Sequence, residues 1–112
     1  MPEQPHRDTL ALFLDTCRRL SQGDEDLVAR LRDAGFVCEP FDWSFTLPAV
    51  HAWLATDEPY PRFRQRLFAS RFNQWLEAFD MRVVIEDNRG KVDANRYRLC
   101  RRPAPQDSSP PR

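Results

Sequence analysis

The spacing of apolar residues changes near residue 80, and that change restricts the fold more than any other feature of the sequence. Through residues 8–79, apolar side chains recur mostly at intervals of three and four, which is typical of amphipathic helices. Between residues 81 and 101 they alternate with polar side chains, which is typical of strands with one buried face. The sequence therefore predicts an α+β fold that is mainly helical and ends in a β-hairpin.

A helical hairpin is predicted for residues 8–35. Asp8 can cap a first helix, because its carboxylate accepts hydrogen bonds from the N–H groups of the first turn. Gly23 interrupts the apolar stripe, a second helix begins near Asp24, and Gly35 suits the left-handed position just past a helix end. The apolar stripes of the two helices comprise Leu10, Phe13, Leu14, Cys17, Leu20, Leu27, Val28, Leu31 and Ala34.

A short strand and a third helix are predicted next. Phe41, Trp43 and Phe45 alternate with polar residues, which permits a strand. Pro40 restricts that strand to a sheet edge or places the proline at its start, because proline has no N–H to donate. Thr46 suits the cap of the third helix, since a proline follows in the first turn.

Residues 61–79 return to helical periodicity, but their apolar stripe shifts by about one residue along the segment. Either one long helix is buried on two sides, or two helices meet near Ala69 and Ser70. We favour the break, with Ser70 as the cap of the second helix. The face of that helix expected to be buried comprises Phe72, Trp75, Leu76 and Phe79.

A β-hairpin is predicted for residues 81–101. An apolar run at residues 83–85 is followed by turn residues 87–90, which end in a glycine that tolerates positive φ. Tyr97 and Leu99 then alternate in a return strand. The alternation before residues 92–95 is out of step with the alternation after them, which favours a β-bulge there.

The length of the chain corresponds to a single domain. We expect the globular part to span residues 8–102, with the helical hairpin at 8–35. Prolines are frequent in the end segments, and we therefore expect residues 1–7 to be a flexible leader and residues 103–112 a disordered tail.

Charge is divided unevenly between the two halves of the chain. Residues 1–58 carry 5 Arg against 11 Asp and Glu, whereas residues 59–112 carry 12 Arg and Lys against 6 acidic residues. The net charges are therefore −6 and +6. Such an asymmetry indicates either that the C-terminal half faces a polyanion or an acidic protein, or that the two halves neutralise each other across one interface.

The motifs of common enzymes and cofactor sites are missing from the sequence. Three glycines are too few for a phosphate-binding glycine loop, and no helix carries the spacing of a zinc-binding histidine pair. Cys17, Cys38 and Cys100 lack the paired spacing of a zinc site or a disulfide framework, and we expect them to be reduced. His51 is interpreted as an ordinary helix histidine. These features favour a non-catalytic protein without a metal or cofactor.

The location of the protein is predicted from two further features. No stretch approaches the roughly 18–20 apolar residues that a membrane span needs. The first 30 residues also lack the basic start and apolar run of a secretory signal. We therefore expect a cytoplasmic protein with no membrane partner.

The order of elements in residues 41–102 resembles that of winged helix-turn-helix domains: helix, short helix, second helix, and then a two-stranded ribbon with a basic turn. The resemblance implies that the helix before the ribbon enters the major groove of DNA. Its polar face carries Arg71, Asn73 and Gln74, residue types that suit the edges of guanine and adenine. Arg89 and Lys91 at the ribbon tip would then contact phosphates.

Two functions are left open by the sequence. A small bacterial-type nucleic-acid-binding protein would use the residues above together with Arg96 and Arg98, which share one face of the return strand. An adaptor would instead bind another protein through an aromatic-rich surface, or an acidic protein through the basic hairpin. A related hypothesis places the acidic helical hairpin of the same chain against Arg96 and Arg98, where it would mask them. The sequence does not indicate an oligomeric state.

Overall fold

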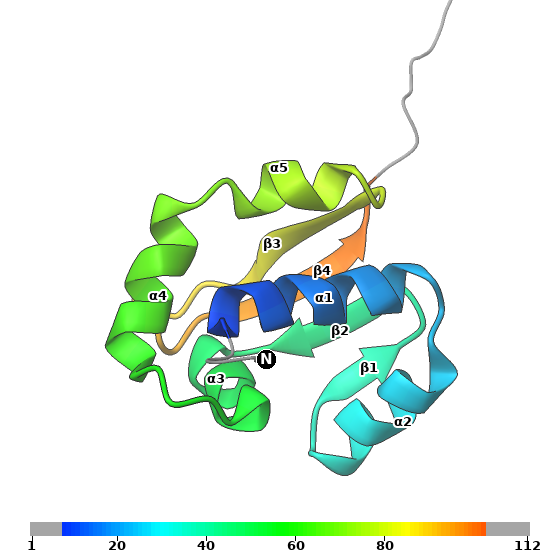
Figure 1. The fold of residues 1–112 in the computed structure, drawn as a ribbon, viewed down its shortest axis with the longest axis horizontal. Coiled ribbons are helices and arrows are strands. Elements are labelled where there is room, and N and C mark those ends of the chain that lie inside the picture. Colours follow the sequence, from blue (N-terminus) through cyan, green and yellow to red (C-terminus); the bar gives the residue numbers. More distant parts are fainter. Residues whose placement is uncertain (1–7, 103–112) are drawn as a thin grey trace, which may run out of the picture.

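The computed structural model describes residues 8–102, and within them the fold is α+β, as predicted: five helices and one four-stranded antiparallel sheet (Figure 1). The predicted leader and tail lie outside the described residues. The elements follow in the order α1 Thr9–Ser21, α2 Glu25–Asp33, β1 Val37–Glu39, β2 Asp42–Phe45, α3 Leu47–Leu54, α4 Tyr60–Ala69, α5 Phe72–Glu77, β3 Met81–Asp87 and β4 Arg96–Arg101.

The sheet has the strand order β1-β2-β4-β3, so β1 and β3 form its two edges. The predicted strand around Trp43 is β2, and it lies inside the sheet between β1 and β4. Of the two positions expected for this strand, the sheet edge is wrong; Pro40 instead lies just before the strand, in the two-residue turn that joins β1 to β2. Phe41 completes that turn with a left-handed φ of 67°. The sequence did not indicate β1, which has only three residues.

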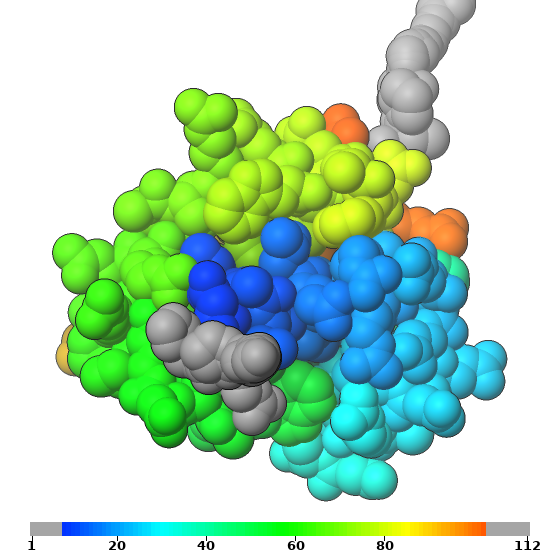
Figure 2. Space-filling view, in the orientation of Figure 1, coloured from blue at the N-terminus to red at the C-terminus, as the bar shows by residue number. Residues whose placement is uncertain are grey.

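The helices cover one face of the sheet. Figure 1 shows α1 crossing in front of β2 and β4, with α2 beside β1 and α5 beside β3. In Figure 2 the helices hide the sheet on this side, and the orange of β4 is visible only at the margin. Trp43 and Phe45 of β2 and Tyr97 and Leu99 of β4 are buried beneath this helical layer.

The core is centred on Phe13 of α1, which is 1% exposed. Its ring lies 5.9 Å from that of Trp43, 5.6 Å from Phe45, 6.0 Å from Phe63 and 4.8 Å from Phe72, measured between centroids. One side chain of α1 therefore contacts aromatic rings from β2, α4 and α5. Edge-to-face and stacked aromatic pairs add about 0.5–1.5 kcal/mol each beyond the burial of apolar area.

The opposite face of the sheet carries polar and charged side chains. Arg82, Arg96 and Arg98 lie on it, because their neighbours along each strand point into the core. The N-terminal helical hairpin packs on the other face, so the hypothesis that it masks Arg96 and Arg98 is wrong. The apolar stripe of α1 explains this placement, since burying it contributes far more than an exposed ion pair could.

Part of the charge asymmetry is neutralised within the molecule. Asp8 and Glu58, from the acidic half, each lie 3.0 Å from a guanidinium nitrogen of Arg66. Asp42 of β2 accepts hydrogen bonds from Arg98 of β4, at 2.9 and 2.5 Å. These pairs support the interpretation that the halves neutralise each other, although exposed pairs contribute only about 0–1 kcal/mol each.

The predicted break within residues 61–79 is confirmed. Helix α4 ends at Ala69, and α5 begins at Phe72. The predicted role of Ser70 is wrong: it terminates α4, and its hydroxyl donates a hydrogen bond to the carbonyl of Leu67 at 2.6 Å. Arg71 occupies the cap position of α5 and makes no side-chain capping hydrogen bond.

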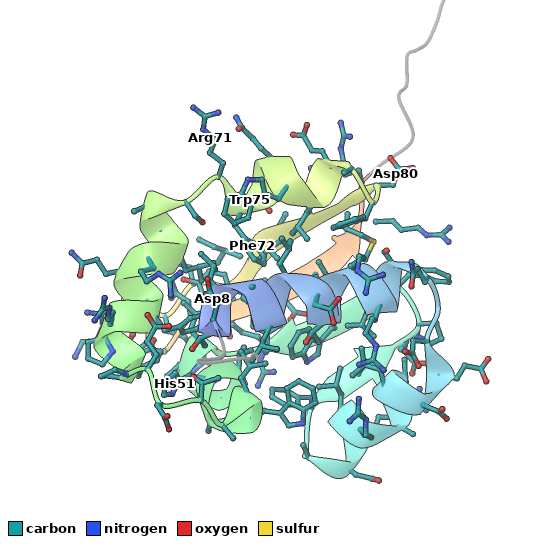
Figure 3. All side chains as sticks on the ribbon, in the orientation of Figure 1. Asp8, His51, Arg71, Phe72, Trp75 and Asp80 are labelled. Atoms are coloured by element: carbon teal, nitrogen blue, oxygen red, sulfur yellow. The ribbon has the colours of Figure 1, made fainter. Side chains whose placement is uncertain are left out.

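Trp75 does not belong to the core, contrary to the sequence prediction. Phe72 and Leu76 are 7% and 0% exposed, whereas Trp75 is 40% exposed. Helix α5 has only six residues and rests on the edge of the sheet. It therefore buries fewer apolar side chains than the sequence predicted. Figure 3 shows Phe72 directed toward the core and Arg71 directed away from the molecule.

The C-terminal β-hairpin is confirmed, with a different position for its irregularity. The register shift lies between Ile85 and Asp87 of β3, and the predicted bulge at residues 92–95 is instead part of the loop that joins the strands. Gly90 has the expected positive φ, at 84°.

Two neighbouring residues of α5 provide a test of this packing. Leu76→Ala should lower the free energy of unfolding by about 2–5 kcal/mol, because it leaves a cavity in the core. Trp75→Ala should lower it by only about 1 kcal/mol, mostly through the lost edge contact with Phe72. Urea denaturation of both variants measures the difference, and equal losses would contradict the exposed position of Trp75.

Candidate binding groove

An apolar groove of about 620 Å³ lies between α4, α5, β3 and the loop that joins β3 to β4. Its floor includes the core rings of Phe13, Phe45 and Phe72. At its mouth Phe68 of α4, Ile85 of β3 and Val92 of the loop are 57%, 53% and 38% exposed. The volume is within the range of about 300–1,000 Å³ that is typical of ligand pockets in proteins.

The break between α4 and α5 opens the groove. Ser70 ends α4, so α5 changes direction and follows the edge of β3 (Figure 1). Asn73 fixes α5 to that edge: its amide donates to the carbonyl of Val83 at 3.2 Å, and its carbonyl accepts from the N–H of Val83 at 2.8 Å. These two hydrogen bonds fix α5 against β3 at Val83.

The loop between β3 and β4 forms the second wall, and α4 holds it in place. Asp93 accepts a hydrogen bond from the hydroxyl of Tyr60 at 2.5 Å and two from the guanidinium of Arg64 at 3.1 Å. Within the loop, the side-chain carbonyl of Asn95 accepts from the N–H of Arg89 at 2.6 Å. These contacts hold Val92 at the mouth of the groove.

The Tyr60–Asp93 contact changes the acidity of both groups. The hydrogen bond from Tyr60 is the largest cause that holds the pKa of Asp93 below its usual range; burial opposes it, and Arg64 adds to it. Burial, together with the Asp93 carboxylate, raises the pKa of Tyr60. Tyr60 therefore stays protonated and donates its hydrogen bond at neutral pH.

The charged residues that line the groove are basic. Arg71 is the one charged side chain among the described lining residues of the groove itself. A second depression shares Phe68 and Val92 with the groove, and its charged lining residues are Arg62 and Arg64. Arg64 is paired with Asp93, whereas the nearest carboxylate oxygen to Arg62, from Glu58, is 3.8 Å away. The rim thus combines apolar contact surface with positive charge.

The structure brings some of the predicted nucleic-acid-binding residues together and separates others. Arg71, Asn73 and Gln74 all line the groove, but both polar ends of the Asn73 amide are used by β3. In the adjacent loop Lys91 has no ion-pair partner among residues 8–102, while Arg89 is bonded to Asp87 at 2.6 Å.

Arg96 and Arg98 lie apart from this group, on the open face of the sheet. Arg98 is paired with Asp42, and that hydrogen bond is the largest cause that raises the pKa of the guanidinium. Within the described chain Arg96 makes no ion pair, and its side chain is exposed. The seven predicted residues therefore do not form one continuous surface.

Between Asp8 and Arg102 no set of three or more His, Cys, Asp or Glu side chains is placed to hold a metal ion. The three cysteines are free; burial raises the pKa of Cys17, and raises that of Cys38 to about 11. His51 Nε2 lies 2.5 Å from the carbonyl of Glu58. Within residues 8–102, none of the helices has the length and hydrophobicity that a membrane span requires.

The apolar residues at the mouth of the groove were not identified from the sequence. One signal in the sequence could have found Phe68. The shift of the apolar stripe in residues 61–79 means that Phe68 cannot share the buried face with Phe63. The run of three apolar residues ending at Ile85 does not provide such a signal for Ile85, because the register places Ile85 opposite the buried Tyr97, on the same face as Val83.

The contact between α4 and the loop predicts a measurable pKa difference. Tyr60→Phe removes the main cause of the low pKa of Asp93, so that pKa should rise toward the usual 3.8, as followed by NMR titration of the carboxyl carbon. The pKa of Asp24, which the N–H of Leu27 and the guanidinium of Arg19 hold below its usual range, should not change. An unchanged pKa of Asp93 would show that Tyr60 does not hold the loop.

The sign of the pH effect follows from the direction of the shift. The pKa of Asp93 is lower in the folded protein than in the unfolded chain. The contact therefore stabilises the loop fully at pH values above the pKa of the unfolded chain, and this stabilisation is lost as the pH falls through the pKa of the folded protein.

Comparisons of the chain with protein-family models, with curated proteins and with solved structures found no match. The function must therefore be inferred from the groove itself.

Proposed function

We propose that this protein is a non-catalytic adaptor that binds an apolar segment of another protein in the groove between α4, α5 and β3. The observation that supports the proposal is the meeting of Phe68, Ile85 and Val92 at the mouth of an apolar cavity. Exposed apolar residues scattered singly are common on protein surfaces, but a cluster around a groove is characteristic of interaction sites.

The energetics favour an occupant at this position. Fully burying a side chain such as Phe68 or Ile85 contributes about 1.5–3 kcal/mol. A few such anchors at the centre of an interface commonly dominate its affinity. Little of this contribution would be lost in ordering the groove, because Asn73 and Asp93 already hold its two walls.

Peptide selection with the full chain tests the proposal. Random peptides selected on the immobilised protein should be rich in apolar residues, and Phe68→Ser should weaken their binding about tenfold or more, as measured by fluorescence polarisation. Val37→Ser is the matched control, because Val37 is 66% exposed but lies on β1, at the other edge of the sheet. Equal losses for both variants, or none for either, would contradict the proposal.

Nucleic-acid binding is the second candidate, in keeping with the winged-helix resemblance. The observation in its favour is that Arg71 and Lys91 are exposed on neighbouring elements, and neither has an ion-pair partner within residues 8–102. The order of α3, α4, α5 and the β3–β4 ribbon also supports it. Two observations count against it: Arg98 is paired with Asp42, and the side-chain amide of Asn73 is bonded to Val83.

A salt titration tests this second candidate. If the protein binds duplex DNA, Arg71→Ala and the double change of Arg89 and Lys91 to alanine should each weaken binding in a gel shift. Each lost phosphate contact should also reduce the slope of log affinity against log salt by about one. The thermal stability should stay nearly unchanged, since these side chains are exposed. No shift at low salt with the parent protein would eliminate this candidate.

A further inference from the structure

We infer that the occupant of the groove is an extended segment of a partner protein that pairs with the outer edge of β3 at Ile85 and carries acidic residues. This inference rests on the proposed adaptor function and specifies the conformation and charge of the partner. Edge strands commonly bind extended peptides in this way, because their outer N–H and C=O groups lack a neighbouring strand.

The groove reaches the backbone edge of β3. Val83, Val84 and Ile85 all line it, although successive side chains of a strand point to opposite faces of the sheet. A cavity that touches three consecutive residues therefore opens onto the strand edge as well as onto one face. β3 is an outer strand of the sheet, and its inner side is paired with β4.

Asn73 shows which backbone groups point outward. The N–H and C=O of Val83 both bond to its side-chain amide, in the manner of a neighbouring strand. In an antiparallel pair, outward-pointing and inward-pointing residues alternate, so Ile85 directs its backbone groups to the same edge. Among residues 8–102, no side chain and no backbone group from outside the sheet bonds to Ile85.

The two ends of this edge limit where a strand can pair. Asn73 occupies the position beside Val83, and α5 covers the edge on that side (Figure 1). At the other end the register shift between Ile85 and Asp87 interrupts the strand. A paired segment would therefore be short, and its affinity would depend on a side chain inserted between Phe68 and Val92 as much as on backbone hydrogen bonds.

The charge of the rim selects an acidic segment. Arg71 lines the groove and has no ion-pair partner within residues 8–102, whereas Arg62 and Arg64 of the adjoining depression lie beside Glu58 and Asp93; none of the described lining residues of either is acidic. Figure 3 shows Arg71 extending away from the body of the molecule, where it can reach a bound chain. Rim charges of this kind act mainly on partner choice and association rate.

Synthetic peptides of about seven residues, with blocked ends and with valine alternating with glutamate, provide the test. We expect this probe to bind the full chain, and its counterpart with lysine in place of glutamate to bind at least about fivefold more weakly. Arg71→Glu should reverse that preference. The amide of Ile85 should exchange more slowly with solvent when the glutamate peptide is bound, as measured by NMR.

Backbone methylation separates a strand from other bound conformations. One derivative is N-methylated at the valines and the other at the glutamates, and a paired strand directs only one of these two sets of N–H groups toward β3. One derivative should therefore lose binding about tenfold or more while the other keeps it. Loss of binding for neither derivative, or for both, would overturn the inference.

The outcomes also distinguish this inference from the proposed function. If selected peptides bind in a way that Phe68→Ser abolishes, but the methylated derivatives bind alike, the groove is an adaptor site for a non-extended partner, and only the inference fails. If no peptide binds, both fail. Sedimentation could instead detect a dimer that is lost in Phe68→Ser, which would assign the groove to a second copy of the chain. Duplex DNA could also displace the glutamate peptide, which would assign the basic rim to nucleic acid. Either result would overturn the inference.

Discussion

The contact between Phe13 and four other aromatic rings is the interaction on which the rest of the structure depends. Phe13 lies on α1, yet its neighbours come from β2, α4 and α5. Because α1 crosses the sheet, this single ring joins the N-terminal helical hairpin to α4, to α5 and to the sheet. It also forms part of the floor of the groove. The same residue therefore anchors the fold and shapes the candidate site.

Several elements could be predicted from the sequence because local signals and burial agree there. Asp8 caps α1 and accepts hydrogen bonds from Leu10 and Ala11 as its position indicated. The C-terminal hairpin also formed where alternation and turn residues coincided. Trp75 shows where this reasoning failed: helical spacing identifies residues on one face, but the width of the buried stripe depends on what the helix packs against. Only the tertiary structure shows that α5 rests on a sheet edge.

The candidate site could be predicted only in part, for a physical reason. Sequence reasoning identified Arg71, Asn73 and Gln74 as neighbours on one polar helix face, and all three line the groove. It did not predict that the side-chain amide of Asn73 would bond to the backbone of Val83 in β3. That contact depends on the direction that α5 takes after the break at Ser70. Opposite charges on distant segments, such as Arg98 and Asp42, likewise meet only through the register of the sheet.

The strand order has a consequence for how the chain folds. β2 pairs with β4, and Trp43 lies opposite Leu99 across that pairing, although three helices and β3 separate them in the sequence. Contacts this distant along the chain close large loops, whose entropic cost delays their formation relative to local turns and hairpins. The β3–β4 hairpin can form early by itself, but the sheet becomes complete only when β2 joins it. Neither charged half is thus an independent folding unit, and the core cannot close until β4 has been synthesised.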